Sequence, residues 1–303
     1  MKKRISCLLI GVCCLLMFVA CGTQSGANSN DNTENQNAEV DLLKKVEKAN
    51  TDEALLAKYG KVAYRHVYTY GDGHSESSYR YLDADRYVVE DGPYIDIVED
   101  GEIYGFDTYV VFRSVFVEDC FAEYAKQYPS VTNFQYSADI EKIESQEEKN
   151  DVLTVVTSTQ DAAILTDWET NSGFEEGLVA SVEFVYELDA KTYELIAMTT
   201  YVVKADGTKI NVCESVRVDN PETYVVDEQI SKIINSEDKR TLTVIAHPGT
   251  EQEKTYSASI GKGNGIIVCL PEDADKTLYL DAECTTVYEG GADLNADLTL
   301  YYK

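Results

Sequence analysis

Histidine most often carries acid–base and metal chemistry at neutral pH, and this chain has three histidines. His66, His74 and His247 stand apart from one another, and none forms the paired spacing of a metalloprotease helix. No serine occupies a G-x-S-x-G turn, and the glycine-rich stretch 261–265 lacks the spacing of a phosphate-binding loop. We therefore predict that the protein is not an enzyme and needs no cofactor.

Acidic residues that could collect Ca²⁺ are frequent in one region, because hard cations prefer several oxygen ligands. These residues are Asp83, Asp85, Asp96, Asp100 and Asp107. None of them belongs to an EF-hand loop, so we predict a solvated acidic edge and no metal site.

The N-terminus has the composition of an export signal. Lys2, Lys3 and Arg4 precede an apolar run over 5–20, which is shorter than the roughly 20 residues that span a bilayer. A small residue, Ala20, stands directly before Cys21. A basic start, a short apolar core and a small residue at the exit are typical of a cleaved signal peptide.

The four residues that end this segment, Phe18-Val19-Ala20-Cys21, resemble the lipobox of bacterial lipoproteins, although that family usually has Leu where this chain has Phe18. The resemblance implies that residues 1–20 are removed and that Cys21 is lipidated. The mature protein would then be extracytoplasmic, with the membrane as its partner through the anchor. Residues 21–40 are almost wholly polar, so we predict a disordered tether.

Charge limits the partners. Without its signal the chain has 23 basic and 54 acidic residues, a net charge of −31. Such a polyanion is repelled by nucleic acid and by anionic lipid, which makes both poor partners. Export would permit disulfides among Cys120, Cys213, Cys269 and Cys284. Four cysteines allow three pairings, and separate buried thiols are the alternative, which we favour slightly.

Helical spacing over 42–49 and a second apolar run at 54–57, capped by Thr51 or Asp52, predict two helices. From Lys61 the hydrophobic period becomes 2, which predicts antiparallel strands. We expect strands at 62–70, 77–82, 87–90, 94–98, 103–106, 140–145, 152–158, 178–188, 193–203 and 209–218, and helices at 116–128 and 221–234.

Tyrosine is concentrated in the first of these strands: 13 of 22 tyrosines fall between Tyr59 and Tyr136. A large apolar ring with a polar tip suits a half-exposed sheet face, and it suits a ligand-binding surface equally well. The candidate binding residues are Tyr64, Tyr68, Tyr70, Tyr79 and Tyr81. Ordinary sheet packing is the competing interpretation.

One leading helix, long antiparallel strands and the turns at 188–192 and 205–208 resemble the half-barrel lipoproteins of the LolA/LppX kind over residues 41–235. The resemblance implies an α+β fold with a curved antiparallel sheet that encloses acyl chains. It carries over no individual binding residue.

Residues 236–303 have a different pattern, with a strand at 241–245, the stretch Asp281-Ala282-Glu283-Cys284-Thr285-Thr286, and a closing strand 297–301. These pieces resemble the internalin-type B-repeat (Listeria–Bacteroides repeat), although Leu278 stands where that family has Trp. The resemblance implies a small β-grasp-like module in surface proteins.

Two functions compete. The first is a non-enzymatic lipoprotein that binds an apolar or amphipathic molecule in its curved sheet, with a lipid, glycan or cell-wall component as ligand. The second is a surface adhesion or interaction protein that uses the C-terminal module and the acidic face.

Overall fold

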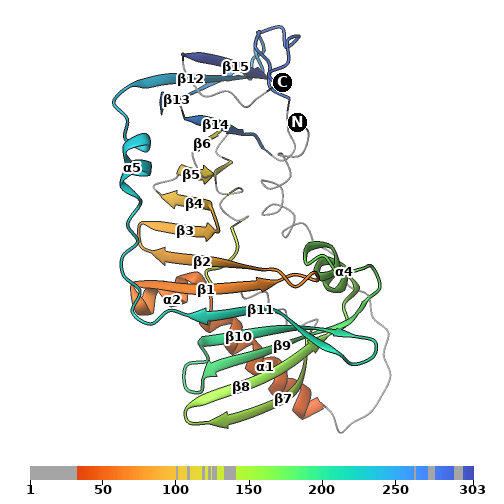
Figure 1. The fold of residues 1–303 in the computed structure, drawn as a ribbon. Coiled ribbons are helices and arrows are strands. Elements are labelled where there is room, and N and C mark those ends of the chain that lie inside the picture. Colours follow the sequence, from red (N-terminus) through yellow and green to blue (C-terminus); the bar gives the residue numbers. More distant parts are fainter. Residues whose placement is uncertain are drawn as a thin grey trace. The chain divides into compact units, whose positions relative to one another are not determined.

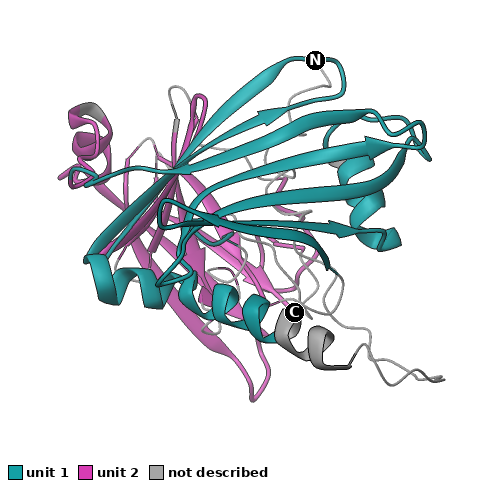
Figure 2. Ribbon diagram, turned by 90° about the horizontal axis from the view of Figure 1, so that it is seen from below, with its two compact units in different colours: residues 1–84, 127–222 teal, residues 85–126, 223–303 magenta. Residues whose placement is uncertain are grey.

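The computed structural model describes residues 33–99, 102–107, 110–117, 120–121, 124, 128–132, 141–262, 264–271, 277–289 and 296–303. The chain folds into two compact units (Figure 2). Unit 1 comprises residues 1–84 and 127–222, and unit 2 comprises residues 85–126 and 223–303. The predicted boundary at residue 236 lies inside unit 2.

Unit 1 contains seven strands that are all antiparallel to their neighbours, in the order β2-β1-β11-β10-β9-β8-β7 (Figure 1). Their bounds are β1 Lys61–Thr69, β2 Ser75–Asp83, β7 Lys142–Lys149, β8 Val152–Thr159, β9 Val179–Asp189, β10 Leu195–Lys204 and β11 Lys209–Arg217. Together with the helices below, these strands make the curved, antiparallel α+β fold that the sequence predicts.

The described residues of unit 1 form the helices α1 Thr33–Ala49, α2 Asp52–Tyr59 and α4 Ala162–Asn171. Thr51 caps α2 by accepting a hydrogen bond from Ala54 N at 3.1 Å, and Gly60 ends it with a left-handed φ of 71°. Helix α1 begins at Thr33, so the last part of the predicted tether is helical. Leu43 and Val46 on this helix are buried, as their spacing predicts.

The turn between β7 and β8 corrects one sequence prediction. The strands expected at 140–145 and 152–158 left a charged turn at 147–151 between them, but β7 continues to Lys149. Asn150 and Asp151 alone make the turn, with φ values of 55° and 62°. Positive φ at both central residues is the requirement of a two-residue hairpin, which Asn and Asp tolerate better than most residues.

Unit 2 contains β14-β6-β5-β4-β3 as neighbours, and the three strands β13-β12-β15. The bounds are β3 Arg86–Asp91, β4 Tyr94–Glu99, β5 Glu102–Asp107, β6 Val110–Phe116, β12 Lys239–Ala246, β13 Lys254–Gly261, β14 Gly265–Cys269 and β15 Leu298–Tyr302. Two pairings are parallel, β14 with β6 and β12 with β15. Helix α5 Glu228–Ile234 is shorter than the predicted helix 221–234.

The core of unit 2 joins its two chain segments. Val115 lies on β6 and Val117 comes directly after this strand. Both belong to one buried cluster with Leu242, Leu270 and Leu300. Residues 85–126 and 236–303 therefore fold around common apolar side chains. Most of the predicted helix 116–128 lies outside the described residues, as do residues 1–32 with Cys21.

Candidate functional site

One face of the unit 1 sheet, which we call the inner face, is buried across six strands. Strand register places Ser78, His66, Ser215, Met198, Tyr186 and Val155 in one row from β2 to β8. All six side chains are at most 5% exposed. The row is polar at its β2 end and apolar at its β8 end.

A second row runs beside the first, through Tyr68, Cys213, Thr200, Phe184 and Thr157. Phe184 and Tyr186 stack with their ring centroids 6.0 Å apart. On the opposite face, Val67 is 36% exposed and Val216 is 49% exposed. The sheet of unit 1 is therefore covered on its inner face and wet on at least part of its other face, as antiparallel sheets commonly are.

At its polar end the inner face holds a buried cluster around His66. The ring Nδ1 lies 2.8 Å from Ser215 Oγ, and Nε2 lies 3.2 Å from the Val131 carbonyl oxygen. Burial, and then the nearby charge of Arg80, lowers the pKa of His66 to about 3. The imidazole is therefore neutral at pH 7.

Arg80 and Asp52 bring opposite charges to the same cluster. Arg80 donates to the Ser130 carbonyl at 3.0 Å and to the Tyr68 hydroxyl at 3.1 Å. Asp52, on α2, accepts from Ser130 Oγ at 2.8 Å and from Val131 N at 3.0 Å. Desolvation raises the pKa of Asp52, partly offset by these hydrogen bonds. Residues 130–131 are thus held over His66.

A second buried carboxylate, Glu141, lies near the apolar end. It is 7% exposed, accepts a hydrogen bond from Thr157 Oγ1, and lies 3.1 Å from the Tyr186 hydroxyl. Because Tyr186 and Thr157 belong to β9 and β8, Glu141 ties the residue before β7 to the inner face.

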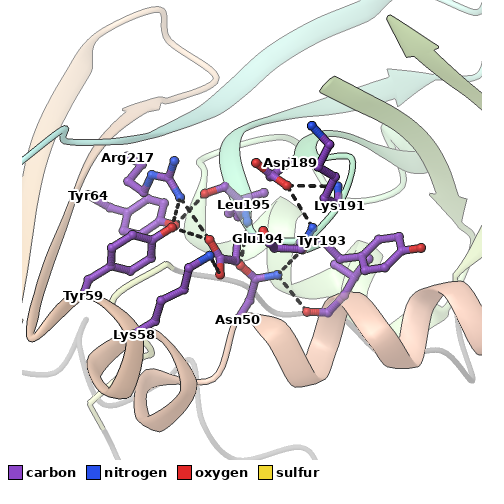
Figure 3. Close-up of polar contacts among 12 residues, drawn as sticks. Asn50, Lys58, Tyr59, Tyr64, Asp189, Lys191, Tyr193, Glu194, Leu195 and Arg217 are labelled. Carbon is purple, nitrogen blue, oxygen red and sulfur yellow. Dashed lines mark hydrogen bonds and ion pairs between the residues drawn. The ribbon is translucent and has the colours of Figure 1, made fainter. Parts of the chain in front are cut away.

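The turn between β9 and β10 is fixed by a third polar cluster, centred on Glu194 (Figure 3). Glu194 lies 2.5 Å from Lys58 Nζ and 3.7 Å from Arg217, and it accepts a hydrogen bond from Tyr59. Asn50, at the end of α1, donates to the Tyr193 carbonyl at 3.0 Å and accepts from Leu195 N at 2.7 Å. These contacts attach α1 and α2 to the sheet.

A groove of about 500 Å³ lies beside α1. It is lined by Asp41, Leu42, Lys45, Gln146, Glu147, Glu148, Leu153, Ala190 and Tyr193. Leu153 pairs with Leu188 and belongs to the inner face. The groove therefore touches the apolar end of the inner face at Leu153, and three of its nine lining residues are acidic.

The five tyrosines proposed from sequence do not form one surface. Tyr64 and Tyr81 are both fully buried, but their registers place them on opposite faces of the β1–β2 hairpin. Tyr68 contacts Arg80, and Tyr70 stacks on His74 with ring centroids 4.3 Å apart. Tyr79, half-buried, pairs with Arg65 on the face opposite Tyr64. The structure thus places most of these rings in side-chain contacts within the protein.

The other candidates for chemistry are dispersed. Among the described residues, no group of three His, Cys, Asp or Glu side chains is arranged to hold a metal ion, and Asp100 lies outside those residues. His74 lies 2.5 Å from Asp72 at a hairpin tip, and the His247 ring packs against Tyr302. The four body cysteines are all buried.

Sequence reasoning missed Arg80, Asp52, Glu141 and Glu194. A signal existed for Arg80, since Tyr79-Arg80-Tyr81 places a charge inside an alternating strand that pairs with an aromatic one. Glu141 and Glu194 carried no local signal, because their partners are distant in sequence.

Comparisons with known proteins give distant likenesses. No family model and no curated relative matches the chain. LprF from Mycobacterium bovis is similar at 11% identity, with 62% of this chain and 95% of LprF covered and a TM-score of 0.30. The LolA superfamily protein NE2245 from Nitrosomonas europaea aligns at 7% identity, covering 63% of this chain and 95% of its own, with a TM-score of 0.25.

Rv2717c from M. tuberculosis aligns at 10% identity over 55% of this chain and 94% of its own, with a TM-score of 0.21. Such low identities and TM-scores assign no activity to this chain. In the part of the chain that the structure describes, no helix is both long and apolar enough to cross a bilayer.

Proposed function

We propose that the protein is an exported, lipid-anchored and non-enzymatic binding protein that takes an apolar or amphipathic ligand on the inner face of unit 1. The observation that carries this proposal is the composition of the inner face. Val155, Phe184 and Met198 give it an apolar part that spans three strands, while His66 and Ser78 give it a polar end. Small-molecule sites combine these features, a mostly apolar lining with a few placed polar groups.

Two details support an amphipathic ligand in particular. The hydroxyl of Ser78 is buried beside His66 and has no hydrogen-bond partner among the described residues, so a ligand oxygen there would satisfy it. The groove beside α1 is lined by Leu153 at the other end of the face, so we place the entry point of an apolar chain there. Because other residues of the protein cover the inner face, a bound ligand takes the place of some of them.

Native mass spectrometry of the chain from Gly22 to Lys303 tests the proposal directly. We expect a co-purifying lipid-sized mass, and displacement of an apolar fluorescent fatty acid by the extracted ligand. Phe184→Ala should weaken probe binding about tenfold, because it removes apolar contact area at the site. Tyr79→Ala, on the opposite face, is the matched control and should bind normally. A clean unliganded mass together with no probe binding would overturn the proposal.

Membrane attachment has its own test at Cys21. Labelled palmitate should follow the protein in growing bacteria, and Cys21→Ser should abolish both the label and membrane retention. Because a single signal segment supplies the anchor, Lys2→Ala should leave the label unchanged. Unaltered membrane fractionation of Cys21→Ser would mean that an uncleaved apolar segment holds the protein.

A second candidate function is supported by β12, β13 and β15. A hairpin followed by a parallel pairing of the first and last strands, β12 with β15, is the strand arrangement of a β-grasp-like module. Its polar face includes the exposed Thr241, Ser257 and Ser259. If unit 1 binds no ligand, we propose this face as the adhesive surface. The test compares how much cell-wall glycan is pulled down by the wild type and by Ser257→Arg.

A further inference from the structure

Two cysteines that are far apart in the chain meet inside unit 2. Strand β14 pairs in parallel with β6, which sets Cys269 opposite Phe116. Directly after β6, Val117 N donates to the Cys269 carbonyl at 3.1 Å, and Cys120 N donates to the Val117 carbonyl at 3.3 Å. These two hydrogen bonds bring Cys120 to the end of β14.

The side chains complete this approach. Cys120 Sγ lies 3.1 Å from the carbonyl oxygen of Cys269, and both residues are 2% exposed. This contact puts the Cys120 sulfur beside the backbone of Cys269, and the two thiols are close enough that a negative charge on Cys120 raises the pKa of Cys269.

The other two cysteines have different surroundings. Cys213 belongs to β11 of unit 1, where its sulfur lies 3.8 Å from Ser215 Oγ. Cys284 contacts the Ala282 carbonyl of its own turn at 3.9 Å. Of the pairings that four cysteines allow, the described contacts favour one.

We propose that Cys120 and Cys269 form a disulfide when the protein folds in an oxidising compartment. The oxidant is a disulfide, either a low-molecular-weight one or that of an exported thiol oxidoreductase. The Cys120–Cys269 S–S bond forms as the oxidant's S–S bond breaks. The two cysteine thiols lose two electrons and two protons, and the oxidant gains them as two thiols.

The burial of the two cysteines determines when the disulfide can form. Desolvation raises the pKa of Cys269 to about 12, so its thiolate, which is the nucleophile in exchange, is scarce once unit 2 has closed. The bond must then form during folding, before the two sulfurs are covered. For the same reason a completed bond resists reduction until the unit opens.

The disulfide would covalently link the two chain segments that supply the core of unit 2. It would close a loop of roughly 150 residues, and long loops gain most from cross-linking because the unfolded chain loses more freedom. For a protein of this size, we expect the Tm to rise by about 5–10 °C.

The test is refolding of the reduced chain from Gly22 to Lys303 with oxidised glutathione, followed by alkylation and peptide mapping. We expect two of the four thiols to disappear, a linked peptide pair that contains Cys120 and Cys269, and the higher Tm, which a reductant reverses only after unfolding. The matched control, Cys213→Ser with Cys284→Ser, keeps the link. Cys120→Ser with Cys269→Ser loses the link and the Tm gain.

Four alkylatable thiols after oxidative refolding, or a different linked pair, would overturn the proposal. The proposal depends on export, part of the proposed function, only for the compartment in which the oxidant is met. Refolding in vitro does not depend on export or on ligand binding. A negative result there would therefore count against the disulfide alone, and a clean unliganded mass would count against the binding function alone.

Discussion

At the scale of single residues, the Tyr64 hydroxyl joins two strands that lie far apart in the sequence. It is fully buried on β1 and donates to the Leu195 carbonyl of β10 at 2.7 Å. We expect Tyr64→Phe to lower the free energy of unfolding by about 1 kcal/mol, because it leaves that carbonyl without its donor. Tyr64→Ala should cost about 3–5 kcal/mol through the cavity it opens. Urea denaturation measures both.

Val216→Ala is the control for Tyr64. Val216 lies on a neighbouring strand but is 49% exposed on the opposite face, so its truncation should cost less than about 0.5 kcal/mol. Equal costs for Tyr64→Ala and Val216→Ala would mean that the inner face is open at Tyr64.

His66 gives the stability of the protein a pH dependence of known sign. Its pKa is lowered from 6.5 to about 3, so between these values the unfolded chain binds a proton that the folded protein does not. The free energy of unfolding therefore falls as the pH falls through this window, by up to about 1.4 kcal/mol per pH unit. Asp52 acts in the opposite sense above pH 3.8, because its pKa is raised from that value.

The His66 contribution should thus be clearest between pH 6.5 and 5. Urea denaturation of wild type and His66→Gln at pH 7, 6 and 5 checks it. The glutamine keeps polar atoms for Ser215 and Val131 but does not titrate, so the variant should lose the slope. Parallel pH profiles would show that His66 takes up its proton in the folded state.

A residue of the candidate site could be found from the sequence only where its partners lie close to it along the chain. The alternation over 62–70 correctly predicted one aromatic face on β1, and Tyr64, His66 and Tyr68 do share it. The sequence could not tell whether that face is covered, because the contacts to Ser130 and Val131 span 50 and 65 residues of chain. Register, not composition, decides the face on which Tyr79 and Tyr81 lie, so the sequence could not separate them from Tyr64.

At the scale of elements, the β1–β2 hairpin and helix α4 meet at a contact that only glycine permits. Gly71 N donates to the Ser172 carbonyl at 2.7 Å, and a Cβ on Gly71 would lie 2.6 Å from the Gly173 carbonyl oxygen. Since backbone cannot rotate away, Gly71→Ala should separate the hairpin tip from α4 at a cost of about 1–3 kcal/mol. Hydrogen exchange over residues 162–173 should accelerate.

Gly73→Ala in the same turn is the comparison. Its φ of 86° makes alanine strained there, at about 1 kcal/mol, yet no atom lies within 4 Å of the added Cβ. That variant should destabilise the turn and leave exchange in α4 unchanged. Faster exchange of α4 in both variants would mean that turn strain, and not the contact, matters.

Elements with a strong period were predicted well from the sequence, and elements whose form depends on a distant partner were not. Strands β9 to β11 and the helix α2 have clear periods and turn residues, and they appear where expected, whereas α1 ends where expected but begins earlier. Strands β6, β13 and β14 were missed. Gly265 in β14 would meet the Phe112 ring if it carried a Cβ, so this strand depends on its neighbour β6 and not on its own propensity.

At the scale of the whole molecule, the division into units follows contacts that no local pattern records. The charged stretch 236–240 looks like a linker, yet the residues after it complete a core begun by residues 110–117. Composition marks where a chain is polar, and long-range pairing decides which segments share a core. A boundary inferred from polarity alone was therefore drawn inside unit 2.

This arrangement predicts how residues 236–303 behave alone. Without β6 they lose the parallel partner of β14 and the apolar contacts of Val115 and Val117, each worth about 1.5–3 kcal/mol when fully buried. A module of this size has a small free energy of unfolding. We expect the isolated segment to show no cooperative thermal unfolding, and limited proteolysis at 236–240 to release no stable fragment. A chain that joins residues 85–126 to 223–303 through a flexible linker should unfold cooperatively, and cooperative unfolding of 236–303 by itself would restore the boundary at 236.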